Sequence, residues 1–350
     1  MKKIVKQVAG IDVAQKELVV CLGRMYEDLS VELYAHKVFA NTPKGFEMLI
    51  LWIKKMTQEG LAVRFVMEAT GVYHEAFAYF LEEKSYEVSI VLPNKISNYM
   101  RTLDTKTITD KTASEAIARF GLERKLEVWQ KPKELYRELK QLTRERAQIV
   151  EERTMVKNQL HAEQTEAYPN KKSVTRIKAR IILLNKQDKA IKEDIAALIK
   201  TDKAVEKKVN NARTAPGVGV LTAAIVLAET NGFELIGSKR QITSYGGLDV
   251  KEKQSGTSVK GKAKISKRGN RHLRKCLHLP ALAAIRHDER FKAIFARLVS
   301  KHGIKMKAAV AVQRKLLELI YTLVSTDTVY DKDYLKRNEN NNTATEKEVA

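Results

Sequence analysis

The chain has 350 residues, 44% of them hydrophobic, and its 64 Lys and Arg residues exceed its 42 Asp and Glu residues by a net charge of +22. This length exceeds one ordinary domain, so we expect two domains and a connecting segment. The charge favours a polyanionic partner over a merely soluble basic protein, and nucleic acid is the best candidate. Only Cys21 and Cys276 occur, which excludes a disulfide or cysteine-based metal framework and fits a reducing cytosol.

Apolar residues do not form a membrane segment in this sequence. No run of about 18 uninterrupted apolar residues occurs, and Asp12 is reached before any long apolar run develops. We therefore expect neither export nor a membrane span, and a cytoplasmic protein.

From Ile4 to about Phe120 the sequence alternates between strand-like and helix-like stretches, which is typical of an α/β domain. The expected elements are strands at 4–14, 17–23 and 31–41, a helix at 43–55, a strand at 64–71, a helix at 72–84, a strand at 86–92, and helices at 95–101 and 111–122. Three early strands followed by alternating helices and strands is the order of a ribonuclease-H-like domain, which we assign to residues 1–130.

Residues 131–209 predict long charged helices with almost no glycine. Apolar residues recur at every seventh position from Leu135 to Val156, and a second series comprises Ile177, Ile181, Leu184, Asp188, Ile191, Ile195 and Leu198. The alternating steps of four and three in this second series indicate a coiled-coil seam. Two structures fit this pattern. One is a dimerising or arm-like coiled coil, and the other is a helical hairpin that packs on its own chain. The first helix is the weaker seam, because Arg146 and Arg153 fall where its stripe should be apolar.

Residues 210–326 predict a second, mostly helical domain, and the polar tail 327–350 is expected to be disordered. Within the domain, TAPGVGVLTAAIVLAE predicts a Pro-Gly turn followed by a helix. Gly217 and Gly219 should allow the backbone to approach a neighbour closely there. Such a turn can present amide groups to phosphates, although a purely structural turn would have the same sequence.

Two acidic residues end predicted strands of the N-terminal domain. Asp12 lies late in the first strand among residues expected to be buried, and Glu68 ends RFVME just before Thr70 and Gly71. A buried carboxylate needs a partner, and acids at adjacent strand ends can converge to bind Mg²⁺ beside substrate phosphates. Each acid alone would more simply cap a turn, but two of them in a basic protein favour a metal site.

A third acidic cluster surrounds the start of the helix expected at 111–122, and contains Asp104, Asp110 and Glu115. Asp110 is the strongest candidate ligand, although an acid at a helix entrance also serves as an N-cap. Two metal ions about 4 Å apart would activate the attacking oxygen and stabilise the leaving oxygen. These acids therefore predict phosphoryl transfer on nucleic acid.

A Gly- and Ser-rich segment of the second domain concentrates basic residues, opposed nearby only by Asp249 and Glu252. They are Lys260, Lys262, Lys264, Lys267, Arg268, Arg271, Arg274 and Lys275. This density predicts a surface that follows a phosphate backbone, with a solvated loop as the alternative. Ser255, before Gly256, can attack phosphorus if its proton is removed and the oxyanion is stabilised. Ser266 is an equal candidate from spacing alone, and His272 is either a base or a packing residue.

Six motifs in both domains carry a resemblance to a known family: GIDVAQKE, VMEATGVY, TDKTASEAIARFG, TAPGVGVLTA, SYGGLDVKEKQSG and ISKRGNRHLR. In this order they resemble the insertion sequence 110 family of transposases, the DEDD type related to the Piv/MooV DNA invertases, from about Lys3 to Val324. The resemblance implies a RuvC-like N-terminal domain with four acids, a coiled-coil connector, and a C-terminal transposase domain with a nucleophilic serine.

The resemblance also implies roles for single residues. Asp12, Glu68 and Asp110 are similar to the first three acids, which bind Mg²⁺, and Ser255 in Gln-Ser-Gly is similar to the serine nucleophile. The family pattern Thr-Asp-x-x-Asp-Ala has its fourth acid where this chain has Ala113. Three alternatives follow for the fourth acid: three acids suffice, Glu115 or Ser114 replaces it, or Asp104 joins the site. We expect a site built on the three acids, with Glu115 as the fourth candidate.

Further partners follow from the same resemblance. It implies a phosphoserine link to cut DNA, a composite site shared between subunits of a homo-oligomer, and a structured non-coding RNA that pairs with donor and target DNA. The expected protein is a bacterial, nucleoid-associated, RNA-guided transposase. The alternatives are a DNA invertase without a guide, a Holliday-junction nuclease that uses water, and a binding protein with a decayed site. The basic serine segment argues against the nuclease, and Ala113 is the best support for decay.

Overall fold

The computed structural model describes residues 2–69, 71–103, 107, 109–234, 236–252, 254–255, 259–260 and 264–333, with the backbone alone at 254–255 and 259–260. Two of the predicted site residues, Asp104 and Lys262, lie outside this part of the chain. The chain divides into two compact units, Met1–Lys131 and Pro132–Ala350, each with its own apolar core.

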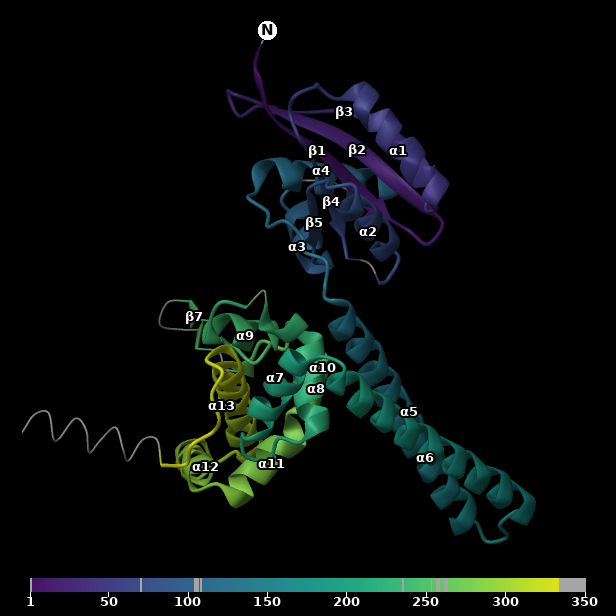
Figure 1. The fold of residues 1–350 in the computed structure, drawn as a ribbon, viewed down its shortest axis with the longest axis vertical. Helices are drawn as coiled ribbons and strands as arrows, with labels where there is room; N and C mark the ends of the chain where they lie inside the picture. Colours follow the sequence, from purple (N-terminus) through teal and green to yellow (C-terminus); the bar gives the residue numbers. More distant parts are fainter. Residues whose placement is uncertain are drawn as a thin grey trace, which may run out of the picture. The chain divides into compact units, whose positions relative to one another are not determined.

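A five-stranded sheet forms the centre of the N-terminal unit (Figure 1), with the strand order β3-β2-β1-β4-β5. The strands are β1 (Ile4–Val13), β2 (Glu17–Tyr26), β3 (Val31–Ala40), β4 (Val63–Glu68) and β5 (Val88–Val91). β2 is antiparallel to both β1 and β3, whereas β4 is parallel to both β1 and β5. This mixed sheet confirms the predicted α/β class, and the strands follow in the order expected of a ribonuclease-H-like domain.

Helices cover both faces of this sheet. They are α1 (Pro43–Met56), α2 (Glu75–Glu83), α3 (Pro93–Met100) and α4 (Asp110–Glu123). Because side chains alternate along a strand, successive residues of β1 enter different layers. Ile11 belongs to the core beside α1 and α2, whereas Gly10 faces α4, where a Cβ atom would lie 2.2 Å from Ala118 N. The missing side chain of Gly10 therefore lets α4 pack directly on β1.

Lys6 fixes the direction in which α4 crosses the sheet. Its Nζ lies 2.6 Å from Gly121 O, 2.9 Å from Leu122 O and 3.2 Å from Arg124 O, at the C-terminal end of the helix. The last carbonyl groups of a helix have no partners within it, and a lysine satisfies them well. Since Lys6 lies near the start of β1, α4 runs antiparallel to that strand. The first residue of α4 is thereby directed to the end of β1 that carries Asp12.

The C-terminal unit begins with two long helices, α5 (Glu134–Thr165) and α6 (Lys171–Lys200), which pack side by side as a hairpin (Figure 1). Asp188, only 4% exposed, forms ion pairs of 2.8 Å with Arg146 and 3.1 Å with Arg153. Burial opposes the ionisation of Asp188, but Lys192 and both arginines hold its pKa below the ordinary value. The two arginines that interrupt the α5 stripe thus have a buried partner in α6. Dimerisation through these helices stays a prediction.

The remaining helices surround a single apolar core, which confirms the predicted mostly helical character of this half. They are α7 (Lys203–Arg213), α8 (Val220–Glu229), the 3-10 turn η1 (Asn231–Phe233), α9 (Lys239–Tyr245), α10 (Arg271–Cys276), α11 (His278–His287), α12 (Glu289–His302) and α13 (Lys305–Ser325). None of the described helices has the length and apolar character needed to traverse a lipid bilayer.

The Pro-Gly turn before α8 agrees only in part with the sequence prediction. At Gly217, φ is +76° and a Cβ atom would lie 2.4 Å from Pro280 O, so the predicted close approach is confirmed there. At Gly219 the Cβ position has no described atom within 4 Å, and the prediction of a close approach is wrong. The reason is that Gly219 has the ordinary extended conformation of a helix N-cap, outside the packed turn.

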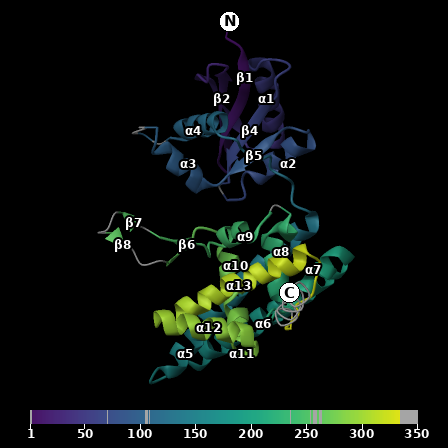
Figure 2. The ribbon, with the colours of Figure 1, turned by 90° about the vertical axis from the view of Figure 1, so that its left-hand side faces the viewer.

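A two-stranded arm lies between α9 and α10, in the basic segment (Figure 2). β6 (Val250–Lys251) pairs with β9 (Lys264–Ile265), and β7 (Gln254–Ser255) pairs with β8 (Val259–Lys260), both antiparallel. Each strand has two residues, too few for an alternation pattern in the sequence. We call the described residues between 245 and 270 the serine arm.

The described start of the predicted tail makes contacts within the C-terminal unit. Asn211 Nδ2 donates to Asp327 Oδ1 at 2.8 Å, and Tyr330 OH donates to Asp288 Oδ2 at 2.8 Å. These bonds attach residues 327–330 to α7 and to the start of α12. Residues 334–350 lie outside the described part of the chain.

Candidate active site

Asp12 and Glu68 lie at the C-terminal ends of neighbouring parallel strands. The last register pair of β1 and β4 is Ile11 with Met67, so Asp12 and Glu68 are the next residues on the two strands. Ile11 and Met67 both belong to the core beside α1 and α2. Because side chains alternate, Asp12 and Glu68 both point to the opposite face of the sheet, which α4 covers.

Asp110 is the first residue of α4 and adds a third carboxylate on this face. The helix cap is the preceding residue: Thr109 Oγ1 accepts from Thr112 N at 3.2 Å, and Thr112 Oγ1 accepts from Thr109 N at 2.8 Å. This reciprocal pair is a capping box in which a threonine takes the usual place of glutamate. The N-cap is therefore Thr109, and Asp110 does not serve that purpose.

The three carboxylates act on one another electrostatically. Burial, and then the negative charges of Asp110 and Glu68, raise the pKa of Asp12 to about 6, while a hydrogen bond from the Val13 amide works in the opposite direction. A divalent cation would relieve this repulsion, and carboxylate oxygens are the ligands that Mg²⁺ prefers. The described residues contain no three acidic, histidine or cysteine side chains already at metal-binding distance. The three carboxylates fit Mg²⁺ by the chemistry of their oxygen donors.

Glu115 lies on a different side of α4, where it contacts β3. Its Oε1 is 3.1 Å from His36 Nε2, and burial followed by the charge of Glu115 raises the pKa of Cys21 to about 12. Cys21 and His36 form a register pair between β2 and β3, on the other side of β1 from the strand that carries Glu68. The structure therefore does not bring Glu115 into the group formed by the other three acids.

Two further positions of α4 bear on the fourth acid. Ser114 is fully buried, and its hydroxyl donates to Lys111 O at 2.7 Å, within the helix itself. Around a helix, Ala113 lies about 60° from Asp110, whereas Glu115 lies about 140° away. A carboxylate at position 113 would therefore face the same side as Asp110, and this chain has none there.

Ser255 lies in β7 of the serine arm, opposite Val259 of β8. Ser266 lies closer to the helices: its hydroxyl donates to Asp249 Oδ1 at 2.5 Å, so it is engaged in the turn at the base of the arm. The candidate base His272 is half-buried in α10, and burial lowers its pKa, which keeps the ring neutral at pH 7. The structure thus gives Ser266 a structural partner and places Ser255 farther along the arm.

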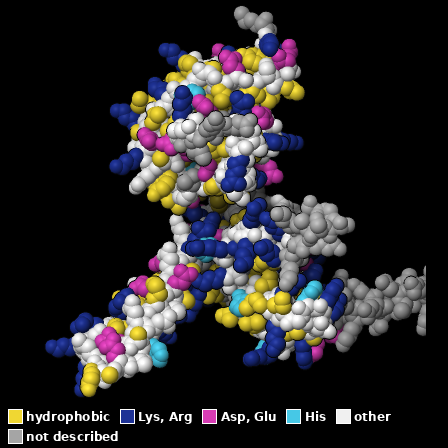
Figure 3. Space-filling view, turned by 180° about the vertical axis from the view of Figure 1, so that it is seen from behind, with side chains coloured by type: hydrophobic (Ala, Val, Ile, Leu, Met, Phe, Trp, Pro, Cys, Tyr) yellow, Lys and Arg dark blue, Asp and Glu magenta, His cyan; other side chains and the backbone are white. Residues whose placement is uncertain are grey.

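The predicted phosphate-binding residues separate into two groups. Lys264, Lys267, Arg268 and Arg271 are exposed, and Lys260 lies in β8. Arg274, in contrast, is half-buried, and its Nη1 donates to Gly246 O at 2.8 Å and Gly269 O at 3.1 Å. Figure 3 shows Lys and Arg side chains gathered on the face of the C-terminal unit that it presents. The exposed group remains suited to phosphates, whereas Arg274 holds the backbone together.

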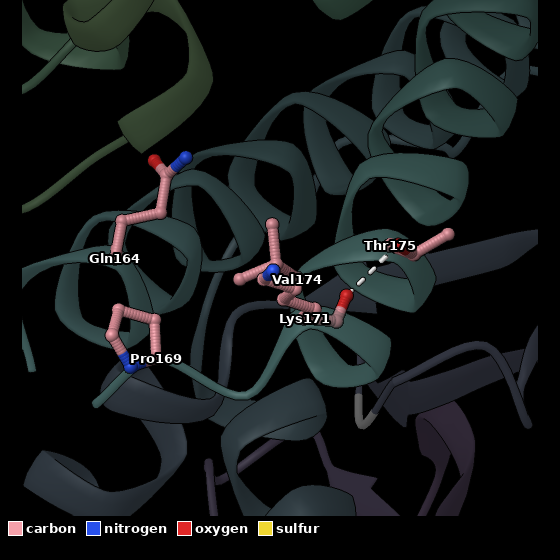
Figure 4. Close-up of a pocket in the computed structure, with 5 residues that line it drawn as sticks. All are labelled: Gln164, Pro169, Lys171, Val174 and Thr175. Carbon is pink, nitrogen blue, oxygen red and sulfur yellow. Dashed lines mark hydrogen bonds between the residues drawn. The ribbon is translucent and has the colours of Figure 1, made fainter.

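A pocket at the tip of the α5–α6 hairpin does not belong to this chemistry (Figure 4). It is lined by Gln164, Pro169, Lys171, Val174 and Thr175. Thr175 Oγ1 donates to Lys171 O at 2.9 Å, and the lining has no acidic, histidine or cysteine side chain. The lining therefore offers no carboxylate, imidazole or thiol to bind a metal or act as an acid catalyst.

Known proteins match this chain over most of its length. Residues 9–169 match the DEDD model of IS110, described as a transposase, and residues 209–296 match the transposase IS116/IS110/IS902 family. The pilin gene-inverting protein of Moraxella bovis is 26% identical over 328 residues, which cover 93% of this chain and 98% of that protein. The transposase for insertion sequence element IS1111A of Coxiella burnetii is 31% identical over 157 residues, or 42% of this chain and 41% of that one.

Among solved structures, T. thermophilus RuvC in complex with a Holliday junction substrate covers 35% of this chain and 99% of its own, at 12% identity and a TM-score of 0.27. The family matches are more informative about the site. Asp12, Glu68 and Asp110 all fall within the first matched region, and Ser255 falls within the second.

Proposed function

This chain belongs to the IS110 family of transposases, in its DEDD type, and on that premise we propose that it cuts and rejoins DNA through a serine link and with Mg²⁺ bound by its N-terminal acids. The observation that carries the proposal is the grouping of Asp12, Glu68 and Asp110 on one face of the sheet, where two of these charges act on the third. Three such carboxylates in a protein of net charge +22 suit a metal that binds substrate phosphates.

Asp12, Glu68 and Asp110 would hold the metal. When bound, Mg²⁺ would stabilise negative charge on the phosphate oxygens during strand exchange. The protein contributes the placement of the ligands: the β1–β4 register aligns two of them, and the Thr109–Thr112 capping box leaves Asp110 to face the sheet. Glu115 is the remaining candidate for a fourth ligand, and its contact with His36 argues against that role.

Ser255 is the proposed nucleophile. Its Oγ would bond to a DNA phosphorus, its proton would pass to a base, and the bond from phosphorus to one deoxyribose oxygen would break. Rejoining reverses these changes when a DNA hydroxyl attacks the phosphoserine. The exposed Lys264, Lys267, Arg268 and Arg271 would bind the phosphates around the cut and stabilise the developing charge.

A structured RNA and a homo-oligomer complete the proposal. RNA pairing would supply the choice of DNA sites, while the basic surface binds backbone phosphates without reading sequence. Assembly of several copies would let the acids of one subunit and the serine arm of another act on one phosphate. The family membership supports both, and the basic surface of the C-terminal unit (Figure 3) supports the RNA.

Replacement of the serine tests the covalent step. Ser255→Ala in the full chain, with its RNA and DNA, should abolish the covalent protein–DNA adduct and leave RNA binding nearly unchanged, as measured by denaturing electrophoresis and by filter binding. Ser266→Ala is the matched control and should still form the adduct, even if more slowly, because Ser266 bonds to Asp249 at the base of the arm and is not the proposed nucleophile. An adduct that persists in Ser255→Ala would refute the assignment.

Replacement of the acids tests the metal site separately. Asp12→Ala and Glu68→Ala should each remove strand cleavage at every Mg²⁺ concentration, because each takes away an oxygen ligand. Cleavage of a labelled DNA substrate is the measurement. Normal cleavage by both variants would dismiss the site.

A second candidate function is site-specific DNA inversion without a guide. The observation in its favour is the match to a pilin gene-inverting protein along 93% of this chain. Sequencing of the RNA that copurifies with the full chain separates the two functions. An RNA with segments complementary to two DNA sites supports guided transposition, whereas the absence of RNA together with recombination at a protein-read site supports inversion.

A further inference from the structure

The base of the serine arm rests on a buried acid, Glu229, the last residue of α8, which is 3% exposed. Its Oε2 accepts a hydrogen bond from Asn270 Nδ2 at 2.7 Å, and its backbone O accepts one from Tyr245 OH at 2.8 Å. Tyr245 ends α9 where the chain enters the arm, and Asn270 caps α10 where the chain leaves it. Glu229 therefore contacts both ends of the arm.

The two sides of the arm are also bonded to each other from these ends outward. Asn270 N donates to Tyr245 O at 2.7 Å, and farther along Lys267 N donates to Gly247 O at 3.1 Å. Ser266 N then donates to Asp249 O at 2.8 Å, directly before the paired strands β6 and β9. A continuous series of backbone bonds thus runs from the residues that Glu229 holds toward the strand that carries Ser255.

Arg144 of α5 forms the third contact of Glu229. Its Nε lies 2.8 Å from Oε1 and its Nη2 lies 3.0 Å from Oε2, a bidentate ion pair between elements far apart in the sequence. Burial opposes the ionisation of Glu229, but Arg144 and Asn270 hold its pKa below the ordinary value.

Stability alone explains this carboxylate poorly. The C-terminal end of a helix is the negative end of its dipole, which disfavours an acid there. A buried ion pair also often contributes no more to stability than well-packed apolar residues would. What the carboxylate does provide is a fixed connection between α5, α8 and the end of the serine arm at Asn270.

We propose that Glu229 is a positioning residue for Ser255: its carboxylate holds the serine arm at Asn270 and ties it to α5 through Arg144, while its backbone O accepts from Tyr245 at the other end of the arm. This inference rests on the proposed function, because it gives Glu229 a part in the reaction of Ser255. Glu229 acts through other residues, so its loss should slow the reaction of bound DNA more than it weakens DNA binding.

Glu229→Gln in the full chain, with its RNA and DNA, tests the proposal. The size and shape of the side chain are kept, but an NH2 group replaces one carboxylate oxygen. An NH2 group cannot accept a hydrogen bond from Asn270 or Arg144. At saturating DNA the rate of adduct formation should fall about tenfold or more, because a small displacement of a reacting group has effects of this size. The DNA concentration that gives half the maximal rate should change by less than about twofold. Amide hydrogen exchange at Lys267 and Asn270 should become faster.

Two further variants make the test specific. Asp288→Asn is the matched control: Asp288 is also buried, at 6% exposed, but it caps α12 and accepts from Tyr330, away from the arm. It should form the adduct at the wild-type rate. In the double variant Glu229→Gln with Asn270→Asp, the amide at 229 donates and the carboxylate at 270 accepts, and Asp still caps α10. This variant should restore most of the rate of adduct formation and the slow amide hydrogen exchange.

The outcomes separate the inference from the proposed function. A wild-type adduct rate and unchanged exchange in Glu229→Gln would overturn the positioning role while Ser255→Ala still abolishes the adduct. An adduct that persists in Ser255→Ala would instead refute the nucleophile, whatever Glu229→Gln does. If Glu229→Gln does not fold, the double variant decides: restored folding with restored rate supports the role, and restored folding without rate refutes it.

Discussion

The acidic face of the N-terminal unit and the serine arm of the C-terminal unit hold their candidate residues in different ways. Asp12, Glu68 and Asp110 belong to regular elements, so strand register and a helix cap determine their positions. Ser255 lies on strands of two residues, and the arm that carries them is fixed at its base by side chains such as Glu229. Secondary structure therefore sets the acidic site, whereas tertiary contacts at a distance from the serine set the arm.

This difference determines where each region should be sensitive to substitution. In the acidic face the sensitive residues should be the carboxylates themselves, because the sheet stays in place without them. In the serine arm, residues at the base should matter as well. Four sets of substitutions test or refine this contrast.

Among these four sets, the largest effect is expected at Asp110, the one acid placed by a helix. Asp110→Ala should lower the initial rate of DNA cleavage by about 100-fold or more, because it would remove one of the proposed oxygen ligands of Mg²⁺. Thr112→Ser keeps the capping hydroxyl and should retain the rate within about twofold. Near-normal cleavage by Asp110→Ala would show that the acids of β1 and β4 act without the helix.

Asp12→Asn should stabilise the metal-free N-terminal unit. Because the pKa of Asp12 is raised from 3.8 to about 6 in the folded state, folding favours the protonated form, and stability is lost as pH rises between these values. With allowance for partial exposure, Asn should add about 1 kcal/mol at pH 8 and nothing near pH 4. The only tryptophans, Trp52 and Trp129, both lie in this unit, so thermal unfolding followed by their fluorescence measures the change. A less stable Asp12→Asn protein at pH 8 would contradict the assigned repulsion.

Smaller effects are expected at the exposed basic residues near the serine arm, because each would be one of several proposed phosphate contacts. Lys267→Ala and Arg271→Ala should each weaken nucleic-acid binding by about fivefold and reduce the slope of log affinity against log salt by about one. Arg271→Lys keeps the charge and should keep the slope. Salt slopes identical to wild type in both alanine variants would exclude these residues from the interface.

The smallest effect is expected at Glu115, which contacts His36 instead of the three acids. Glu115→Gln should change DNA cleavage by less than about twofold, since a group outside the ligand set makes no contact specific to the reaction. Ala113→Asp is the informative comparison, because position 113 faces the same side of α4 as Asp110, and it should tighten apparent Mg²⁺ binding. A large loss of cleavage in Glu115→Gln would return Glu115 to the metal site.

Much of the N-terminal unit could be predicted from the sequence. Apolar alternation in the early strands and the amphipathic helices identified each element of the sheet domain, and acids after buried strand residues identified Asp12 and Glu68. The N-cap of α4 was harder to predict from the sequence, because Thr109 and Asp110 are both good cap residues. Only the hydrogen bonds in the structure show that the cap is Thr109. The helix expected from Val72 begins at Glu75, after a turn that includes Gly71 at a φ of +57°.

The C-terminal unit was less predictable, because its polar contacts join residues far apart in the chain. Arg144 and Glu229 are 85 positions apart, and Asn270 is 41 positions beyond Glu229, so no local pattern relates them. Arg146 and Arg153 weakened the apolar stripe of α5 in the sequence, and only the fold shows that both form ion pairs with Asp188. Strands of two residues also have no periodicity to detect.

The buried ion cluster of the hairpin has a consequence for how this protein can be redesigned. Arg146 and Arg153 are one heptad apart and both contact Asp188, so a slip of one helix by a heptad would leave a buried charge unpaired. The ion cluster thus fixes the register of α5 against α6. Seven residues could be inserted into, or deleted from, both helices between this ion cluster and the connecting loop at 166–170. Such changes should lengthen or shorten the hairpin without moving the residues of the C-terminal apolar core.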